Sequence, residues 1–418
     1  MARLPSPRGA LALLTGLNFL NYIDRFIPAA ILPTILASFG LTGAEGGFLQ
    51  TMFILTMAFV SPIAGWMGDR HPRFRVAAAG VFVWSAATFG SGLAPTFAAL
   101  VVARALIGVG EASYTVVTPS LLSDFYPTGQ RARVLSIFYA AIPIGSALGY
   151  VLGSQIAAHF GWRYSFYVAG VPGLMLAIIL LFLKEPTRGA QDAKPVPRPK
   201  RDGSTSSVVV IANAVRQLLM RRSFLINTIS QTIYTFSVGG LAVWMPTYFV
   251  RERGLSEATA STTFGVVLAL AGFTGTIIGG RLGDWMARRR PDAHFLLSGI
   301  SLVGSLPFTV LAILSPTPAI FWPSMFVTLS MLFLNAGPLN AALANVLPAE
   351  LRGRGFAFNT WAIHLFGDAA SPPIIGWASD RVGLRAPVLG AGALMAVAGL
   401  VLLFGRGAFT RDLKAAAA

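Results

Sequence analysis

Long apolar runs alternate with short polar connections along this chain. Runs of about 20 apolar residues are long enough to cross a bilayer as helices. Several of the runs are longer than a bilayer requires, as expected for tilted or kinked helices. Twelve runs are expected to span the membrane, at residues 9–36, 45–68, 75–93, 96–120, 131–158, 163–184, 220–249, 258–286, 294–314, 318–346, 353–379 and 386–405. The pattern predicts an all-α polytopic membrane protein with twelve transmembrane helices.

One long polar stretch interrupts the apolar runs. It reads "KEPTRGAQDAKPVPRPKRDGSTSSVVV" and is rich in Pro, Lys, Arg and Ser, a composition typical of a flexible linker. We therefore expect an N-terminal six-helix half over residues 1–184, a cytoplasmic linker over 185–219 and a C-terminal six-helix half over 220–418.

Short motifs recur in the two halves at separations of 213 to 222 residues. "GWMGDRHPRFR" (65–75) matches "GGRLGDWMARRR" (279–290), "LPTIL" matches "MPTYF", and "PTGQRAR" matches "PAELRGR". Chance could produce one such match, but several in register indicate a duplicated six-helix unit. Two parallel repeats are typical of transporters with a substrate site near the bilayer midplane.

Composition supports the membrane assignment and explains the charge. Charged residues make up 11% of the chain, against about 25% in soluble proteins. The absence of cysteine excludes disulfides and thiolate metal sites. The net charge of +16 would suggest nucleic acid in a soluble protein, but 25 of the 32 Lys and Arg fall on the side of the predicted termini and only five on the other. This asymmetry predicts cytoplasmic termini and leaves no need for a nucleic-acid partner.

Four charged residues stand inside the predicted spans of the N-terminal half. Asp24 and Arg25 lie in "LNFLNYIDRFIPAAILPTIL", and Arg104 and Glu111 lie in the fourth span. Each costs about 2.5–3.5 kcal/mol at the centre of a bilayer on insertion scales, so such residues usually face a partner or a cavity. Arg104 and Glu111 are about 10.5 Å apart along one helix face, and we expect each to meet a residue of another helix.

These charges admit two interpretations. In the first, Asp24 and Glu111 take up and release a proton as their surroundings change, and Arg25 and Arg104 are their partners or bind an anionic headgroup. In the second, the four charges are a static network that joins the first and fourth spans.

The C-terminal half lacks a matching set, because Ser237 stands where Asp24 would repeat. His364 and Asp368 are four residues apart and share a helix face, either for transport or as hydrogen-bonded packing residues. Further polar and aromatic residues are candidates for lining a cavity: Asn21, Tyr22, Tyr114, Phe138, Asn335, Trp361 and His364.

A row of glycines follows Pro143 in the fifth span. Gly145, Gly149 and Gly153 lie four apart on one face, which favours close contact with another helix. A kink at the proline is the alternative.

The run from Gly65 to Arg75 resembles the loop signature of the major facilitator superfamily, with Pro72 where a glycine is usual. A narrower set resembles its Spinster branch: "LNYIDRF", "RALIGVGEASY", "TPSLLSDFYP", "RARVLSIFYAAIPIGSALGY", "KEPTRG" and, more loosely, "LRGRGFAFN". This resemblance implies a bacterial-type homologue of proteins that export lysophospholipids and sphingoid phosphates with protons.

The resemblance also implies roles for individual residues. It supports Asp24 and Glu111 as the proton-coupling pair. It implies that Asp69 takes part in gating beside Arg70, with Asp284 as a weaker counterpart in the second half. The neighbouring arginines, Arg73 and Arg75, are expected to be ordinary cationic loop residues.

The sequence therefore predicts a proton-coupled secondary transporter for an amphipathic, lipid-like substrate, working by alternating access. The alternatives are an exporter of drugs or small organic anions, or a non-transporting receptor. No His-rich cluster, Gly-x-Ser-x-Gly or nucleotide loop indicates an enzyme. We expect a monomer in a bacterial inner membrane, without cofactor or metal, whose partners are protons, the bilayer and the substrate.

Overall fold

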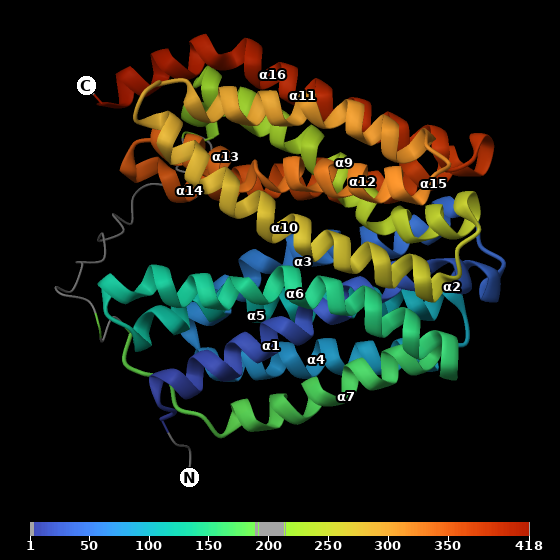
Figure 1. Ribbon diagram of the computed structural model, residues 1–418. Coiled ribbons are helices and arrows are strands. Elements are labelled where there is room, and N and C mark those ends of the chain that lie inside the picture. The colour runs from blue at the N-terminus through green and yellow to red at the C-terminus, as the bar shows by residue number, and fades with distance from the viewer. Residues whose placement is uncertain (1–3, 189–190, 192–212, 214, 418) are drawn as a thin grey trace. The chain divides into compact units, whose positions relative to one another are not determined.

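The computed structural model describes residues 4–188, 191, 213 and 215–417, and the elements assigned there are all helices (Figure 1). Their bounds in the first part of the chain are α1 (Pro7–Ala30), α2 (Leu32–Phe39), α3 (Gly43–Arg70), α4 (Arg73–Leu93), α5 (Phe97–Phe125), α6 (Thr128–Phe160) and α7 (Trp162–Leu181). The later helices are α9 (Arg222–Arg253), α10 (Glu257–Ala287), α11 (Ala293–Leu314), α12 (Pro318–Phe333), α13 (Ala336–Val346), α14 (Ala349–Ile363), the π-helical η1 (His364–Asp368), α15 (Ser371–Val382) and α16 (Arg385–Ala417).

Ten of the described helical segments are long and apolar enough to cross a membrane, and the bent pair α1 and α2 forms an eleventh. The expected span 9–36 is broken at Ile31, where the chain bends by 55°. Pro33 in the first turn of α2 lacks a backbone N–H and so cannot continue the hydrogen bonding of α1. The expected span 353–379 is likewise divided among α14, η1 and α15.

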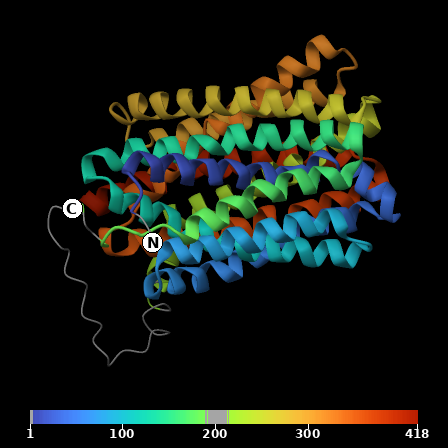
Figure 2. The ribbon, with the colours of Figure 1, turned by 90° about the horizontal axis from the view of Figure 1, so that it is seen from below.

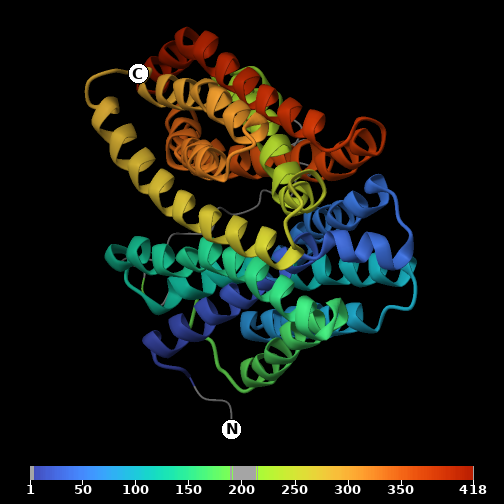
Figure 3. The ribbon, with the colours of Figure 1, turned by 45° about the vertical axis from the view of Figure 1, so that its right-hand side comes forward.

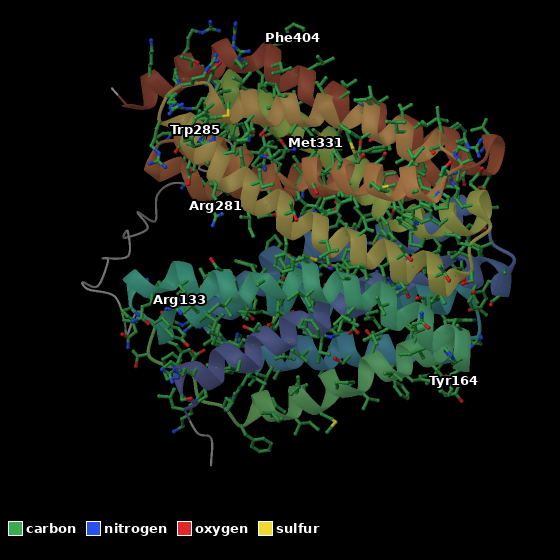
Figure 4. All side chains as sticks on the ribbon, viewed as in Figure 1. Arg133, Tyr164, Arg281, Trp285, Met331 and Phe404 are labelled. Atoms are coloured by element: carbon green, nitrogen blue, oxygen red, sulfur yellow. The ribbon has the colours of Figure 1, made fainter. Side chains whose placement is uncertain are left out.

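The described chain forms two compact units, and unit 1 contains α1 to α7. Within it α4 packs against α5 and α7, α3 packs against α5, and α1 packs against α6. Figure 2 shows α1 and α6 side by side along most of their length. Arg133 and Tyr164 mark opposite ends of this unit (Figure 4).

The predicted glycine row is the contact surface of α6 for α1. A Cβ on Gly145 would lie 2.8 Å from the carbonyl oxygen of Phe19, and one on Gly149 would lie 2.6 Å from that of Ile23. Side chains at these positions would therefore push the two helices apart. The predicted close helix contact is therefore confirmed, and α6 continues through Pro143.

Two segments from the second half of the sequence, Val243–Val266 and Pro372–Asp380, also belong to unit 1. Thr34 donates a hydrogen bond of 2.6 Å to Glu257, and Asp380 accepts one of 2.9 Å from the backbone N–H of Gly43 at the start of α3. The Asp380 carboxylate thus supplies an acceptor for a helix N-terminus that has no internal partner there. These bonds join α2 and α3 to α10 and α15.

Unit 2 contains the remaining parts of α9 and α10, the helices from α11 to η1, and the chain from Arg381. Figure 3 shows α11 beside α16, and α11 also packs against α12. Phe404 projects from the outer face of α16 with 86% of its surface exposed (Figure 4). Such an exposed apolar side chain suits a surface that faces lipid hydrocarbon.

Most of the expected linker, residues 189, 190, 192–212 and 214, lies outside the described residues. The expected division into residues 1–184, 185–219 and 220–418 concerns the sequence repeat, and it stays a prediction.

Candidate functional site

The buried charges of unit 1 are brought together by α1, α3 and α5. Arg25 on α1 donates a hydrogen bond of 2.6 Å to the Oε2 atom of Glu111 on α5. The Glu111 side chain is fully buried and the Arg25 side chain is 15% exposed. The sequence-based expectation that Glu111 meets a residue of another helix is therefore confirmed, because the charge-assisted bond joins α1 to α5.

Asp24 precedes Arg25 but faces a different neighbour. It is 2% exposed, and its Oδ2 atom accepts a hydrogen bond of 3.4 Å from Thr88 on α4. Its Oδ1 atom has no hydrogen-bond partner among the described residues. The charges of Glu111 and Arg104 lie near enough to act on Asp24. Two carboxyl groups thus share one buried region, an arrangement in which the ionisation of one affects the other.

Arg104 has a neutral hydrogen-bond partner. It donates a hydrogen bond of 3.0 Å to the side-chain oxygen of Gln50 on α3. The expectation that it meets a residue of another helix is confirmed. Its guanidinium lies over the ring of Phe53, 4.8 Å from the centroid, and that of Arg25 lies over the same ring at 5.0 Å. Gln50 and Phe53 are neighbours of the cluster that the charge pattern of the sequence did not identify.

The other candidates on the N-terminal helices lie at different depths. Tyr22 presents its ring to Arg25 at 4.7 Å from the centroid. Asn21 and Tyr114 are fully buried, and Tyr114 donates its hydroxyl to the carbonyl oxygen of Leu14. The carbonyl oxygen of Phe138 accepts a hydrogen bond from Asn18. A cavity-lining role for Asn21, Tyr22, Tyr114 and Phe138 stays a prediction.

In unit 2, Asn335 lies at the break between α12 and α13. It donates to the carbonyl oxygen of Met331 over 2.9 Å and accepts a hydrogen bond of 3.1 Å from Ser301. Trp361 on α14 is 41% exposed. The structure thus places these two cavity-lining candidates in different surroundings, and their role stays a prediction.

His364 and Asp368 form a pair in the π-helical segment η1. The Nδ1 atom of His364 lies 3.0 Å from the carboxylate of Asp368. The predicted shared face is confirmed, although the local helix is wider than an α-helix. Single-turn π segments are frequent at functional sites, which favours a functional role for this pair. Its role in transport stays a prediction.

A second charge cluster joins the start of α4 to the end of α5. Arg73 is buried, and its Nη2 atom lies 2.5 Å from Asp124. Its backbone N–H also donates a hydrogen bond of 2.7 Å to Glu185. The expectation that Arg73 is an ordinary cationic loop residue is therefore wrong. Arg75, two residues later, is exposed as expected.

The end of α3 is capped by a residue that the sequence did not identify. Arg188 donates hydrogen bonds to the carbonyl oxygens of Gly68, Asp69 and His71. A cation at this position satisfies carbonyl groups that have no partner within the helix. Both Glu185 and Arg188 lie in the motif "KEPTRG". Their charges were the sequence signal that could have identified them as partners of α3 and α4.

The three gating candidates are exposed at helix ends. Asp69 is exposed at the end of α3, and Arg70 stacks on Trp66 at 4.1 Å from the ring centroid. Asp284 is exposed near the end of α10, within unit 2. Their gating role stays a prediction.

The fold and the buried charges are those of a membrane transport protein, and three comparisons identify its class. Residues 14–367 match the model of the Major Facilitator Superfamily. Protein spinster homolog 1 of Bos taurus is 34% identical over 392 residues, which cover 89% of this chain and 73% of that protein. The sphingosine-1-phosphate transporter SPNS2 of Xenopus tropicalis is 32% identical over 390 residues, covering 89% and 74%.

Solved structures agree with the fold. A bacterial homologue of the human lysosomal transporter Spinster, in an inward-facing and unoccupied conformation, superposes with a TM-score of 0.86 at 22% identity and covers 98% of both chains. A D-xylose–proton symporter superposes with a TM-score of 0.74 at 18% identity, covering 94% of this chain and 96% of that one.

The chain therefore belongs to the Spinster family of the Major Facilitator Superfamily. This confirms the resemblance and the predicted class: an integral membrane transporter of the superfamily's helical fold rather than an enzyme. The twelve predicted helices are consistent with it.

Proposed function

We propose that this protein is a proton-coupled secondary transporter of an amphipathic lipid with an anionic headgroup, of the lysophospholipid or sphingoid phosphate type. The observation that carries the proposal is the ion pair between Arg25 and the buried Glu111, beside a second buried carboxyl group, Asp24. A relative's description as a sphingosine-1-phosphate transporter supports the substrate class.

The cluster is suited to exchange a proton for a phosphate group. Protonation of Glu111 removes the negative charge that holds Arg25 over 2.6 Å. A phosphate can then replace Glu111 as the anionic partner of Arg25 and bind its guanidinium through two parallel hydrogen bonds. Arg104, whose Nε and Nη1 atoms have no hydrogen-bond partner among the described residues, offers a second guanidinium.

Asp24 is the proposed site of proton entry and release. Its Oδ1 atom is buried without a hydrogen-bond partner in the described part of the chain. A carboxyl group in such surroundings changes its affinity for a proton when water or a cation approaches. In alternating access, exposure of the site to one side of the membrane and then to the other provides that change.

The test is proton-driven uptake into liposomes of purified protein, with a pH gradient and a panel of lysophospholipids and sphingoid phosphates. Wild type should accumulate one of them under the gradient, and Asp24→Asn should lose the gradient-dependent part. Glu45→Gln is the matched control, because Glu45 is exposed and Gln preserves the capping box it forms with Thr42.

Two results would contradict the proposal. Equal, gradient-independent flux in wild type and Asp24→Asn would exclude proton coupling at this residue. Gradient-driven transport of dyes or small organic anions, with no lipid transported, would favour the alternative exporter.

We also propose that both termini lie in the cytoplasm, because of the charge distribution of the sequence. The similarity to a bacterial Spinster homologue supports a bacterial inner membrane as the location.

A further inference from the structure

Two arginines of unit 1, the partly buried Arg25 and the buried Arg104, share one aromatic ring. The guanidinium carbons of Arg25 and Arg104 lie 5.0 Å and 4.8 Å from the ring centroid of Phe53. Phe53 is 1% exposed, so water does not weaken these contacts. Cations at this distance over a ring are attracted by its negative face, most strongly where both partners are desolvated.

This arrangement needs an explanation, because like charges repel strongly in a low-dielectric interior. Arg25 is held by Glu111, but the hydrogen-bond partner described for Arg104 is the neutral Gln50. Asp24 and Glu111 balance the two cations while they are ionised. Each proton that the cluster takes up leaves it with one more uncompensated positive charge.

The charged side chains found together here in the described part of the chain come from α1 and α5. Asp24 and Arg25 lie on α1, and Arg104 and Glu111 lie on α5. The sequence has no Asp, Glu, Lys or Arg at residues 46–68 of α3, 76–93 of α4 or 134–158 of α6. Tyr22 on α1 is a titratable side chain that also contacts the cluster, because its ring faces Arg25.

A close contact between the backbones of α3 and α5 sets the position of Phe53. A Cβ on Gly108 of α5 would lie 2.5 Å from the carbonyl oxygen of Phe53. The glycine therefore allows α5 to approach α3 at the level of the ring. Arg104 is one helical turn before Gly108, so the same approach brings its guanidinium over Phe53.

We propose that Phe53 is a positioning residue. The negative face of its ring, which does not titrate, stabilises the charges of Arg25 and Arg104 while the cluster is protonated. The inference rests on the proposed proton-coupled function. A third carboxylate could balance the arginines, but it would itself bind a proton, whereas the ring attracts cations at every pH. A leucine or isoleucine would fill similar space without this attraction.

The experiment replaces Phe53 with 4-fluoro-, 3,5-difluoro- and 3,4,5-trifluorophenylalanine. Successive fluorines weaken the negative face of the ring while nearly preserving its size. The matched series is at Phe166 on α7, which is also 1% exposed and packs against Trp162. Proton-driven lipid flux is measured against pH in liposomes, and thermal unfolding of the same proteins is measured in detergent.

We expect the pH of half-maximal flux to fall stepwise in the Phe53 series, by about one pH unit with three fluorines. The carboxyl groups should bind protons less readily, because a fluorinated ring stabilises the two guanidinium charges less once the carboxyl groups are neutral. The unfolding temperature should fall with each fluorine, more steeply in the Phe53 series than in the Phe166 series, whose flux profile should stay at the wild-type pH.

An unchanged or upward-shifted profile in the Phe53 series, with wild type still coupled to protons, would overturn the inference and leave the proposed function intact. Absence of proton-driven flux in wild type would instead overturn the proposed function and, with it, the role of Phe53 in coupling. Equal thermal effects in the two series would show that the ring provides packing only.

Discussion

Arg73 at the start of α4 lies 2.5 Å from Asp124 near the end of α5. Both side chains are almost completely buried, and Glu185 contacts the same arginine from beyond α7. Arg73 therefore joins the start of α4 to the end of α5 and to the segment after α7. A buried cation held by two carboxylates is strongly dependent on its partners, since its desolvation is costly.

The first prediction concerns this arginine. Arg73→Ala removes the guanidinium that lies 2.5 Å from the buried Asp124 and should lower the free energy of unfolding by about 3–5 kcal/mol. Arg75→Ala is the control, because Arg75 is exposed two residues away, and it should change stability by less than about 0.5 kcal/mol. Thermal or denaturant unfolding in detergent measures both; similar small effects for the two variants would contradict a structural role for the buried pair.

A second prediction separates the ion pair of the transport site from its individual charges. Glu111→Gln removes the carboxylate that accepts the 2.6 Å bond from the partly buried Arg25 and should destabilise the protein by up to about 3–5 kcal/mol. It should also abolish proton-driven flux. The double variant Arg25→Gln with Glu111→Gln should be more stable than the sum of the two single effects predicts, because neither remaining group is charged.

The readout is a double-mutant cycle of unfolding free energies, accompanied by flux. Additive effects of the two substitutions would mean that Arg25 and Glu111 do not depend on one another. Restored proton-driven flux in the double variant would contradict the role of Glu111 in coupling.

The sequence predicts the helical membrane fold well, because an apolar run of sufficient length has few other stable states in a bilayer. It also identifies the four buried charges, since a charge inside an apolar span is conspicuous. It does not identify Phe53 or Gln50, because an aromatic or amide residue in a span is unremarkable until the chain brings two guanidinium groups against it.

Arg73 shows a different limit. Its surroundings in "GDRHPRFR" are rich in arginine, and a basic loop is expected on the positive side of any membrane protein. Its contacts with Asp124 and Glu185 distinguish the buried Arg73 from the exposed Arg75. Which cation of a loop becomes buried depends on tertiary contacts that short-range sequence patterns do not contain.

A third prediction follows from Asp292, in the connection between α10 and α11. Burial raises the pKa of its carboxyl group, but hydrogen bonds and the positive charges of Arg290 and Arg406 outweigh burial and lower that pKa below its usual value. Since the folded state binds the proton less tightly than the unfolded state, the ionised group adds stability above about pH 4. That contribution is lost as the pH falls through the lowered pKa.

The comparison is between wild type and Asp292→Asn, unfolded thermally in detergent from neutral pH to below pH 4. Wild type should unfold at the higher temperature near neutral pH, and the difference should narrow as the solution becomes more acidic. A difference that stays constant over the whole range would contradict an ionic contribution from Asp292.

The last prediction uses the hydrogen bond between Thr34 on α2 and Glu257 at the start of α10, which spans 2.6 Å. The natural sequence has no cysteine, so Thr34→Cys with Glu257→Cys gives a protein with two thiols at known positions. A short bifunctional thiosulfonate should link them, because the native side chains are in contact. If transport requires α2 and α10 to separate, the linked protein should lose most of its flux and recover it when dithiothreitol cleaves the link. The single variants, treated in the same way, should keep their flux.

Undiminished flux in fully linked protein would show that this contact stays closed during transport, and alternating access would then have to open elsewhere.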